Sequence, residues 1–332
     1  MQSSRPARRP RSRLSGLCAA LLCSVVDCAA AEMRELRTFA PLEAASSLDA
    51  DKVALGRMLF GDSILSRTRA IACTSCHDLA RGGTVPLSRA IAEDGREHGF
   101  NAPTIFNVAA NYLLGWRGKQ TSLEAVSEKV LLDGRLMAAD WELLTARLEQ
   151  SRSYVSWFRR IYGRKADRAS LLDALVTFQR SLLTPNSRFD RYLRGDGSAL
   201  TPGEREGLKL FMSYGCASCH QGVNLGGNMR QRFGIFPEPD GPPESPSKAA
   251  PPDASEQNLF RVPSLRNVAV TAPYFHDGGV ASLSEAVSIM GRRQLGQTLS
   301  ASDTDAIVSF LKTLTGEYDG RELENPAPAR VP

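Results

Sequence analysis

The sequence predicts a mainly α-helical protein made of two copies of one module. Apolar residues recur at the three- and four-residue spacing of amphipathic helices, and alternating strand patterns are scarce. A repeat at an offset of 160 residues aligns Pro103–Ala109 (PTIFNVA) with Pro263–Ala269 (PSLRNVA), and its register continues to Gly118 and Gly278. With 332 residues, 42% of them hydrophobic and 23% charged, the chain is long enough for two domains of ordinary size.

Residues 1–31 have the pattern of a secretory signal peptide. Five arginines lie in the first 13 residues, an apolar run follows from Leu14 to Val26, and Ala29–Ala31 offers an Ala-x-Ala cleavage site. An uncleaved membrane anchor is the alternative, although the run is short for a span and Asp27 interrupts its end. We therefore expect a soluble mature protein that is exported.

The formal charge of +5 comes from this predicted leader. Without residues 1–31 the chain carries 36 basic and 35 acidic residues, so that almost no net charge remains. A nucleic-acid-binding function thereby loses its main support.

Helix signals recur at equivalent places in the two copies. We expect a helix from about Asp51 to Phe60, and another that opens at the capping box Thr201–Glu204 (TPGE). The segment 236–257 is rich in Pro, Ser, Asp and Glu and predicts a surface loop. Two further amphipathic helices, ended by Pro185 and Gly316, are indicated by these apolar residues: Leu171, Leu175, Phe178, Leu182, Ile307, Phe310, Leu311 and Leu314.

The cysteines point to the chemistry. Cys18, Cys23 and Cys28 fall in the predicted signal peptide, and the other four form two Cys-x-x-Cys-His motifs. These motifs are Cys73-Thr74-Ser75-Cys76-His77 and Cys216-Ala217-Ser218-Cys219-His220. Two thiols one turn apart can each form a thioether to a haem vinyl group, and the adjacent imidazole then lies beneath the iron. The motifs therefore predict two covalent c-type haems, with His77 and His220 as proximal iron ligands.

Two other interpretations of these cysteines are weaker. A four-cysteine zinc site usually has its two pairs 15–20 residues apart, whereas these pairs lie 143 residues apart and each is followed by a histidine. Redox-active Cys-x-x-Cys motifs seldom occur twice with a following histidine. We therefore predict two tandem cytochrome-c-like haem domains related by internal duplication, at residues 45–190 and 191–318, with a flexible tail at 319–332.

A second axial ligand decides whether a haem iron only transfers electrons or also binds a small molecule. Met290 is the candidate in the second module, with Met212 and Met229 as rivals and ordinary core packing as the alternative. The 160-residue offset places Val130 opposite Met290, and valine cannot bind iron. The first haem is therefore expected to be open, unless His98 closes it as a distal ligand rather than lying in a solvated loop.

An aromatic residue also stands at a repeated position. Trp116 occupies the place that His276 takes in the second module. A tryptophan between two redox centres can relay electrons, and aromatic core packing is the alternative.

The motifs resemble those of a known family. The two haem motifs, Cys219–Asn224 (CHQGVN), Val262–Ala269 (VPSLRNVA) and Ala272–Gly278 (APYFHDG) together resemble the bacterial dihaem cytochrome c peroxidase family, which includes the MauG-type enzymes. The resemblance covers roughly residues 45–318. It implies a periplasmic enzyme that reduces hydrogen peroxide to water with electrons from a small cytochrome or cupredoxin. Dimerisation is expected on the same ground.

The resemblance also implies roles for particular residues. The second haem, with His220 and Met290 as ligands, would be the high-potential site where electrons enter. The first haem, on His77, would be the peroxide site, and Trp116 would lie between the haems with His98 as a further catalytic candidate. A calcium ion would be held by the side chain of Asn101 and the backbone carbonyls of Thr271 and Pro273, since calcium prefers oxygen ligands.

The chain departs from the family at two positions. Glu93 stands where the main peroxidases have a distal histidine, and Leu136 stands where they have a catalytic glutamate. Leucine cannot move a proton during O–O cleavage, and the possible substitutes are Asp133, Asp140, Glu97 and His98. Two alternative functions therefore remain. The first is a MauG-type oxidase that modifies Trp or Tyr of a partner protein; Met290 argues against it, because that archetype has tyrosine at this position. The second is an electron-transfer dihaem cytochrome with little peroxidase activity.

Overall fold

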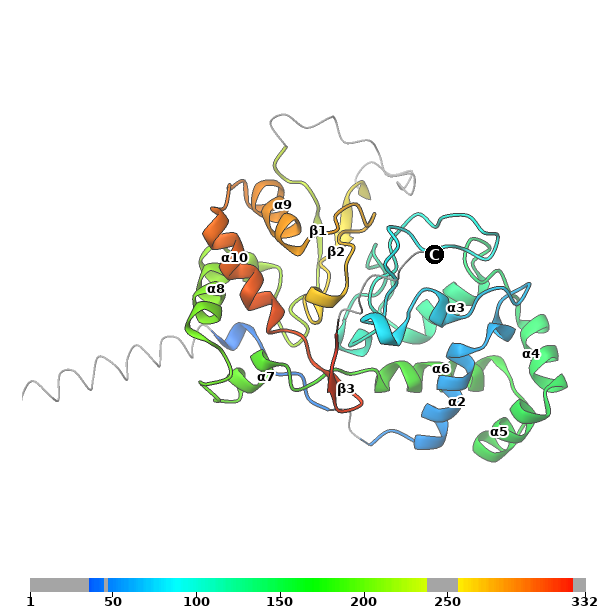
Figure 1. The fold of residues 1–332 in the computed structure, drawn as a ribbon. Helices are drawn as coiled ribbons and strands as arrows, with labels where there is room; N and C mark the ends of the chain where they lie inside the picture. Colours follow the sequence, from blue (N-terminus) through cyan, green and yellow to red (C-terminus); the bar gives the residue numbers. More distant parts are fainter. Residues whose placement is uncertain (1–35, 45–46, 238–255, 325–332) are drawn as a thin grey trace, which may run out of the picture. The chain divides into compact units, whose positions relative to one another are not determined.

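The computed structural model describes residues 36–44, 47–237 and 256–324 (Figure 1). The chain divides into residues 1–39 and residues 40–332, and in the first unit only a 3-10 turn, Leu36–Thr38, is described. The predicted signal peptide lies outside the described residues, as does most of the predicted loop at 236–257.

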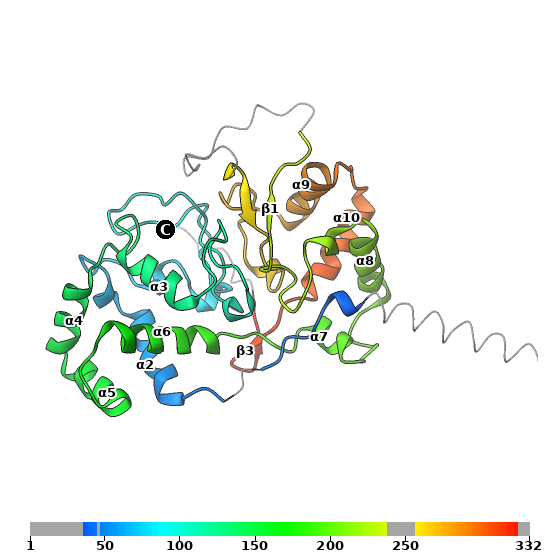
Figure 2. The ribbon, with the colours of Figure 1, turned by 180° about the vertical axis from the view of Figure 1, so that it is seen from behind.

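The first half of the second unit is helical and is built around the crossing of two long helices. Its helices are α2 (Ala50–Gly61), α3 (Leu123–Leu132), α4 (Trp141–Gln150), α5 (Arg152–Tyr162) and α6 (Arg168–Ser181). Asp49 and Asp167 begin α2 and α6 as N-caps, because each carboxylate accepts backbone N–H groups of the first turn. Helix α2 packs across α6 (Figures 1 and 2), and their apolar faces form the core.

The second half repeats this plan with fewer helices. Its helices are α7 (Arg188–Leu193), α8 (Pro202–Ser213), α9 (Leu283–Leu295) and α10 (Ala301–Lys312). Helix α8 lies against α10 (Figure 1), as α2 lies against α6. Two short antiparallel pairs complete it: β1 (Arg230–Arg232) with β2 (Leu259–Arg261), and β3 (Glu317–Tyr318) with β4 (Arg321–Glu322).

Backbone details recur at the 160-residue offset and confirm the internal duplication. Asn107 and Asn267 both adopt the left-handed conformation, which asparagine tolerates better than most residues, and each precedes a 3-10 turn. The bridge between Leu114 and Gln120 recurs between residues 274 and 280. Ser122 begins α3 as its N-cap, and Ser282 does the same for α9. The mainly helical fold class is confirmed as well.

The helices expected from the sequence are all present. Helix α8 has the predicted capping box, with reciprocal bonds between Thr201 and Glu204 and Pro202 at the first helical position. Helices α6 and α10 end four residues before the expected stops at Pro185 and Gly316. Helices α3, α4, α5, α7 and α9 were not among the expected elements, and the buried faces of α4 and α5 pack against the core of the first half.

The end of the chain differs from expectation. The segment 319–332 was expected to be a flexible tail, yet residues 321–322 form β4 and Leu323 packs against the core of the first half. Leu323 also donates its N–H to the carbonyl of Gly316. Residues 325–332 lie outside the described part. The domain boundary at 190/191 falls within α7 and stays a prediction.

Candidate active site

The second Cys-x-x-Cys-His motif forms a single tight turn at the end of α8. Gly215 adopts a φ of +87°, which turns the chain into the 3-10 turn Cys216–Ser218. The N–H groups of Cys219 and His220 both donate to the carbonyl of Cys216, at 3.2 and 3.0 Å. This winding places the two thiols one turn apart and the imidazole directly after them, as thioether attachment of a haem requires.

The imidazole of His220 is oriented by backbone carbonyls. Its Nδ1 lies 3.2 Å from the carbonyl oxygen of Leu225, and a further backbone hydrogen bond involves Pro263. Burial lowers the pKa of His220 to about 4, so the ring is neutral at ordinary pH. A neutral ring whose Nδ1–H is engaged leaves Nε2 free to bind a metal.

The first motif has the same geometry. The 3-10 turn Cys73–Ser75 carries His77, whose Nδ1 lies 3.3 Å from the carbonyl of Gly83 and also bonds the backbone of Pro103. Pro103 and Pro263 are equivalent in the repeat, so both histidines are held in one way. Burial lowers the pKa of His77 as well.

The cysteines of the two motifs are not gathered into one metal site. Burial raises the pKa of Cys73 to about 12 and that of Cys216 to about 11, so both groups are neutral thiols in the protein alone. Within the described ranges, no group of three or more His, Cys, Asp or Glu side chains is placed to hold a metal ion. The four-cysteine zinc interpretation is therefore wrong.

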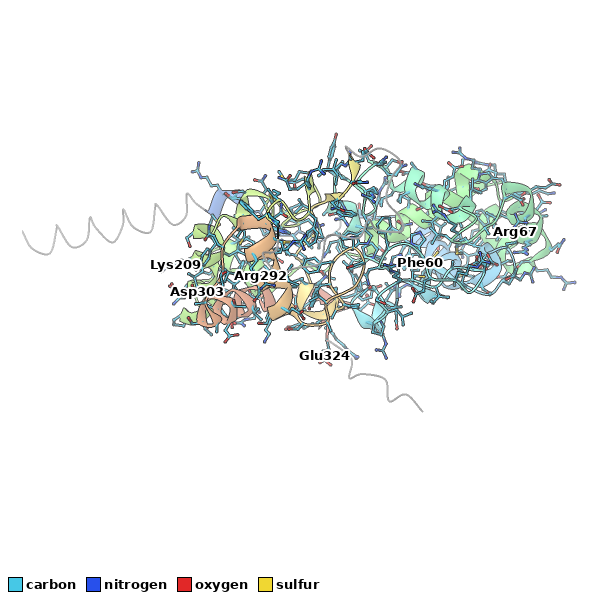
Figure 3. All side chains as sticks on the ribbon, turned by 90° about the horizontal axis from the view of Figure 1, so that it is seen from above. Phe60, Arg67, Lys209, Arg292, Asp303 and Glu324 are labelled. Carbon is cyan, nitrogen blue, oxygen red and sulfur yellow. The ribbon has the colours of Figure 1, made fainter. Side chains whose placement is uncertain are left out.

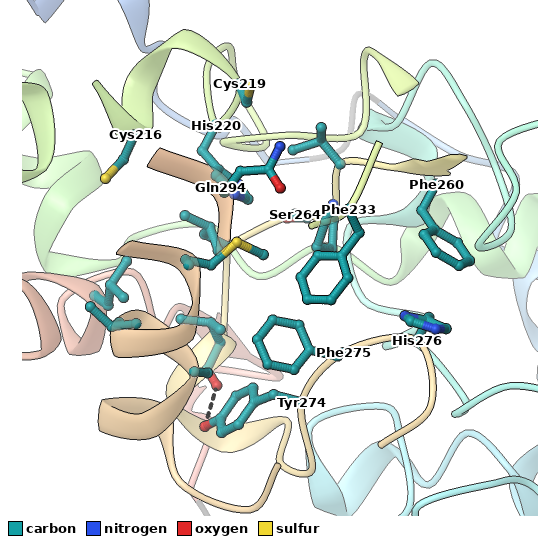
Figure 4. Close-up of a pocket in the computed structure, with 18 of the residues that line it drawn as sticks. Cys216, Cys219, His220, Phe233, Phe260, Ser264, Tyr274, Phe275, His276 and Gln294 are labelled. Carbon is teal, nitrogen blue, oxygen red and sulfur yellow. Dashed lines mark hydrogen bonds between the residues drawn. The ribbon is translucent and has the colours of Figure 1, made fainter. Parts of the chain in front are cut away.

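A large, mainly apolar cavity opens beside the second motif (Figure 4). Cys216, Cys219 and His220 line it on one side, and aromatic side chains including Phe233, Phe260 and Phe275 line the other. An apolar cavity bounded by two thiols and a neutral imidazole fits a c-type haem, which is a flat apolar macrocycle. Met290, on α9, also lines this cavity, whereas neither Met212 nor Met229 does.

The distal residues of the first module lie elsewhere. Val130, on α3, packs against the core of that module and offers no ligand. His98 is half-buried, and its Nδ1 accepts the N–H of Phe100 at 3.3 Å. Burial lowers the pKa of His98, and the charges of Arg135, Asp133 and Lys129 also act on it. His98 therefore lies close to the segment that carries Leu136.

Glu93 makes contacts that the sequence did not indicate. Its carboxylate accepts the backbone N–H groups of Arg67, at 2.8 Å, and of Thr68. Its own N–H donates to the carbonyl of Leu136 at 3.1 Å. Glu93 thus joins three loops, and Leu136 is half-buried at one of them. No local sequence signal could have revealed this, because the three loops are brought together only by the fold.

Trp116 and its repeat partner meet between the two modules. The Trp116 and His276 ring centroids lie 6.4 Å apart, and the Trp116 Nε1–H donates to the carbonyl of Asn101 at 2.8 Å. The imidazole of His276 stacks on Phe260, with centroids 4.1 Å apart. Trp116 and His276 both line the cavity of the second motif.

The three residues considered for calcium are neighbours in the fold. Asn101 is buried, and its N–H donates to the carbonyl of His276 at 2.8 Å, which ties it to the segment that contains Thr271 and Pro273. All three residues line the same cavity. The amide nitrogen of Asn101 donates to the carbonyl of Leu87 at 3.0 Å, so the amide is oriented by the protein.

No helix in the described part of the chain is both long and apolar enough to cross a bilayer. Residues 1–31, the predicted signal peptide, lie outside the described part of the chain.

The chain is similar to proteins of one known family. The family model described as di-haem cytochrome c peroxidase matches residues 50–198. The cytochrome c551 peroxidase of Nitrosomonas europaea is 36% identical over 287 residues, which cover 85% of each protein. The methylamine utilization protein MauG of Methylorubrum extorquens is 30% identical over 291 residues, covering 83% of this chain and 82% of MauG. A solved MauG-like protein associated with microbial copper homeostasis matches with a TM-score of 0.70 and 27% identity, over 86% of this chain and 96% of that one.

The matches to the Nitrosomonas protein and to the solved structure extend across both haem motifs and both halves of the fold. Identity of 36% over most of both proteins goes well beyond a shared architecture, and it accounts for the two Cys-x-x-Cys-His turns as sites for two c-type haems. The chain therefore belongs to the di-haem cytochrome c peroxidase family of enzymes, which includes MauG.

Proposed function

We propose that the chain reduces hydrogen peroxide to water at the haem of the first module, with electrons that enter at the haem of the second. One observation carries the proposal: Met290 shares a cavity with His220, whereas its repeat partner Val130 packs into the core. One haem would then have two protein ligands and the other only one. Each haem, when bound, would supply an iron that can change its oxidation state, and the haem held by His77 alone would be the one able to bind peroxide.

The surroundings of the protein residues support different roles as haem ligands and in electron transfer. His77 and His220 would be the proximal ligands, since carbonyls hold their Nδ1 atoms. Met290 would raise the potential of the second haem, because methionine ligation favours the reduced iron. Trp116 would relay electrons between the haems, and its contact with His276 at the junction of the modules supports this role.

Calcium and partners belong to the same proposal. The neighbouring positions of Asn101, Thr271 and Pro273 support a calcium ion bound by their oxygen atoms at the junction of the modules. The electron donor would be a small cytochrome or cupredoxin in the periplasm, reached by export through residues 1–31, and the enzyme would act as a dimer. Domains at 45–190 and 191–318 would each carry one haem.

Peroxide turnover tests the proposal. The purified dihaem protein, supplied with a reduced small cytochrome, should oxidise that cytochrome in proportion to the peroxide added and far faster than free haem does. His77→Ala should abolish this turnover while leaving the second haem attached. Turnover no faster than that of free haem would overturn the proposal.

A second function is favoured by Leu136. Without a carboxylate at this position, proton transfer during O–O cleavage loses help that is typically worth about 10²–10⁴ in rate. The chain would then be an electron-transfer dihaem cytochrome with little peroxidase activity. Rapid reduction of both haems by the donor without peroxide turnover would support this function.

A third function rests on the 30% identity to MauG. In that case peroxide would be used to oxidise Trp or Tyr of a partner protein. Mass spectrometry of co-purified partners after peroxide treatment distinguishes this outcome from simple peroxide reduction.

A further inference from the structure

Two arginines face each other across the short β1–β2 pair. Arg230 on β1 is the direct partner of Arg261 on β2. Like charges placed opposite each other in a sheet repel, so each needs a neutralising group. Glu256 supplies one for Arg230, at 3.1 Å, and it also binds Lys119 at 2.5 Å. No ion pair within the described ranges includes Arg261.

Arg261 is a buried cation with an unused donor. Only 5% of the residue is exposed, and its Nε–H donates to the carbonyl of Gly115 at 3.1 Å. Its Nη1 has no hydrogen-bond partner among the described residues. Burial lowers the pKa of Arg261 to about 10, which still leaves it charged at neutral pH. A buried charge without a counter-charge destabilises the fold, so we expect Arg261 to have an anionic partner outside the polypeptide.

The position of Arg261 limits what that partner can be. The residue lines the cavity that also contains Cys219, His220 and Met290. Its N–H donates to the carbonyl of Trp116 at 2.8 Å, so it lies where the cavity meets the first module. A further cation, Arg117, stacks on Phe260 with 4.5 Å between guanidinium and ring. This side of the cavity is therefore cationic and apolar.

We propose that Arg261 binds a propionate carboxylate of the haem attached to Cys216 and Cys219, and thereby raises the reduction potential of that haem. The cavity beside the second motif fits a haem. The propionates of a haem are its only anionic substituents. A guanidinium can meet a carboxylate through two parallel hydrogen bonds, which uses the donor that the polypeptide leaves unpaired. A fixed positive charge beside the haem favours the reduced iron, which carries one positive charge fewer.

The proposal requires the second haem but not peroxide chemistry. A protein without peroxidase turnover can still pass or fail the test below, so failure of the proposed function and failure of this inference are distinguishable.

Potentiometry of each haem tests the proposal. Arg261→Gln should lower the equilibrium constant for reduction of the second haem tenfold or more, and tenfold corresponds to about 59 mV for a one-electron couple. Arg261→Lys, which keeps the charge, should lose much less. Lys209→Gln is the matched control, because Lys209 is an exposed cation on α8 of the same module (Figure 3), and its removal should leave the potential unchanged.

Resonance Raman spectroscopy reports the contact directly. The propionate bending mode of the second haem should shift in both Arg261 variants, since an ammonium group cannot replace two parallel hydrogen bonds. Unchanged potential and unchanged bending mode in Arg261→Gln would overturn the proposal, as would a shift confined to the first haem. If Arg261→Gln fails to fold, an unshifted bending mode in Arg261→Lys would overturn it instead.

Discussion

At the scale of single residues, Glu93 and Leu136 meet in the first module through a backbone hydrogen bond. Glu93 accepts backbone N–H groups from Arg67 and Thr68, so its carboxylate is occupied in joining loops. Leu136 provides the carbonyl that holds the N–H of Glu93, and its side chain is apolar. The Glu93 carboxylate and the Leu136 carbonyl thus both join loops, and the apolar side chain of Leu136 offers no acid or base.

Restoring the acid at position 136 should accelerate the reaction with peroxide. Leu136→Glu is expected to raise the rate tenfold or more, because acid–base help of this kind contributes about 10²–10⁴. The measurement is stopped-flow mixing of peroxide with the half-reduced protein at matched haem loading. Leu132→Glu, which alters an exposed leucine at the end of α3, is the control and should change nothing. A fast wild-type reaction with no gain in Leu136→Glu would assign proton transfer to another residue, with Asp133 and Asp140 the first to mutate.

Binding of the haem iron by the sulfur of Met290 can be tested by absorption spectroscopy. Met290→Ala should abolish any sulfur-to-iron charge-transfer band and lower the potential of the second haem, because axial ligand identity is a main determinant of haem potential. Near-infrared absorption and potentiometry measure both effects. Met212→Ala, which removes a methionine outside the cavity, should leave them unchanged. The opposite pattern would identify Met212 as the ligand.

At the scale of elements, each Cys-x-x-Cys-His motif follows a helix that packs closely across a second helix. The Cβ of an alanine at Gly56 would lie 2.1 Å from the carbonyl oxygen of Ala174, and at Gly207 it would lie 1.9 Å from that of Ala306. The first crossing joins α2 to α6 and the second joins α8 to α10. Since α2 and α8 each lead into a haem motif, these glycines set the distance between the motif and its supporting helix.

Gly207→Ala should therefore destabilise the protein despite the better helix propensity of alanine. Overpacking of this kind typically costs about 1–3 kcal/mol of unfolding free energy. Urea denaturation of the haem-loaded protein measures the loss. Gly203→Ala on the same helix is the control, because its Cβ would meet no atom within 4 Å, and it should be neutral or stabilising. Equal stability of the two variants would contradict the tight crossing of α8 and α10.

At the scale of the whole molecule, one buried ion pair connects distant parts of the chain. Arg266 and Asp190 are fully buried and joined by two hydrogen bonds of 2.9 and 3.0 Å. Arg266 also donates to the carbonyls of Val223 and Ala40, and Asp190 accepts the N–H of Leu42. The pair thus links the segment that contains Ala40 and Leu42 to the loop that follows His220.

Removing one member of this pair should be costly. Asp190→Asn leaves a buried guanidinium without its counter-charge, and such changes typically cost about 3–5 kcal/mol. The midpoint of urea denaturation measures the effect. Glu43→Gln breaks an exposed ion pair with Arg194 and should cost no more than about 1 kcal/mol. Comparable losses in the two variants would show that the buried pair has no special role.

The sequence by itself determined the features that depend on neighbouring residues. The two Cys-x-x-Cys-His turns and the capping box at Thr201 are local patterns, and the structure retains each of them. The 160-residue repeat was found by comparing short segments of the sequence, and equivalent backbone features recur at the same offset. The cofactor type follows from the motifs, because thioether attachment needs only residues within one turn. The repeat also identified Val130 and Met290 as equivalent positions with different chemistry.

Only the tertiary structure decided which distant groups meet. The repeat made Trp116 and His276 equivalent, but their contact exists because the two modules pack with these loops together. Glu93 could be placed opposite the family's histidine by sequence, yet its bonds to Arg67 and Thr68 come from loops 25 residues away and more. Arg261 looks ordinary in the sequence, since burial and a missing counter-charge are properties of its surroundings. Local propensity cannot encode such relations, because they depend on long-range packing and on the exclusion of water.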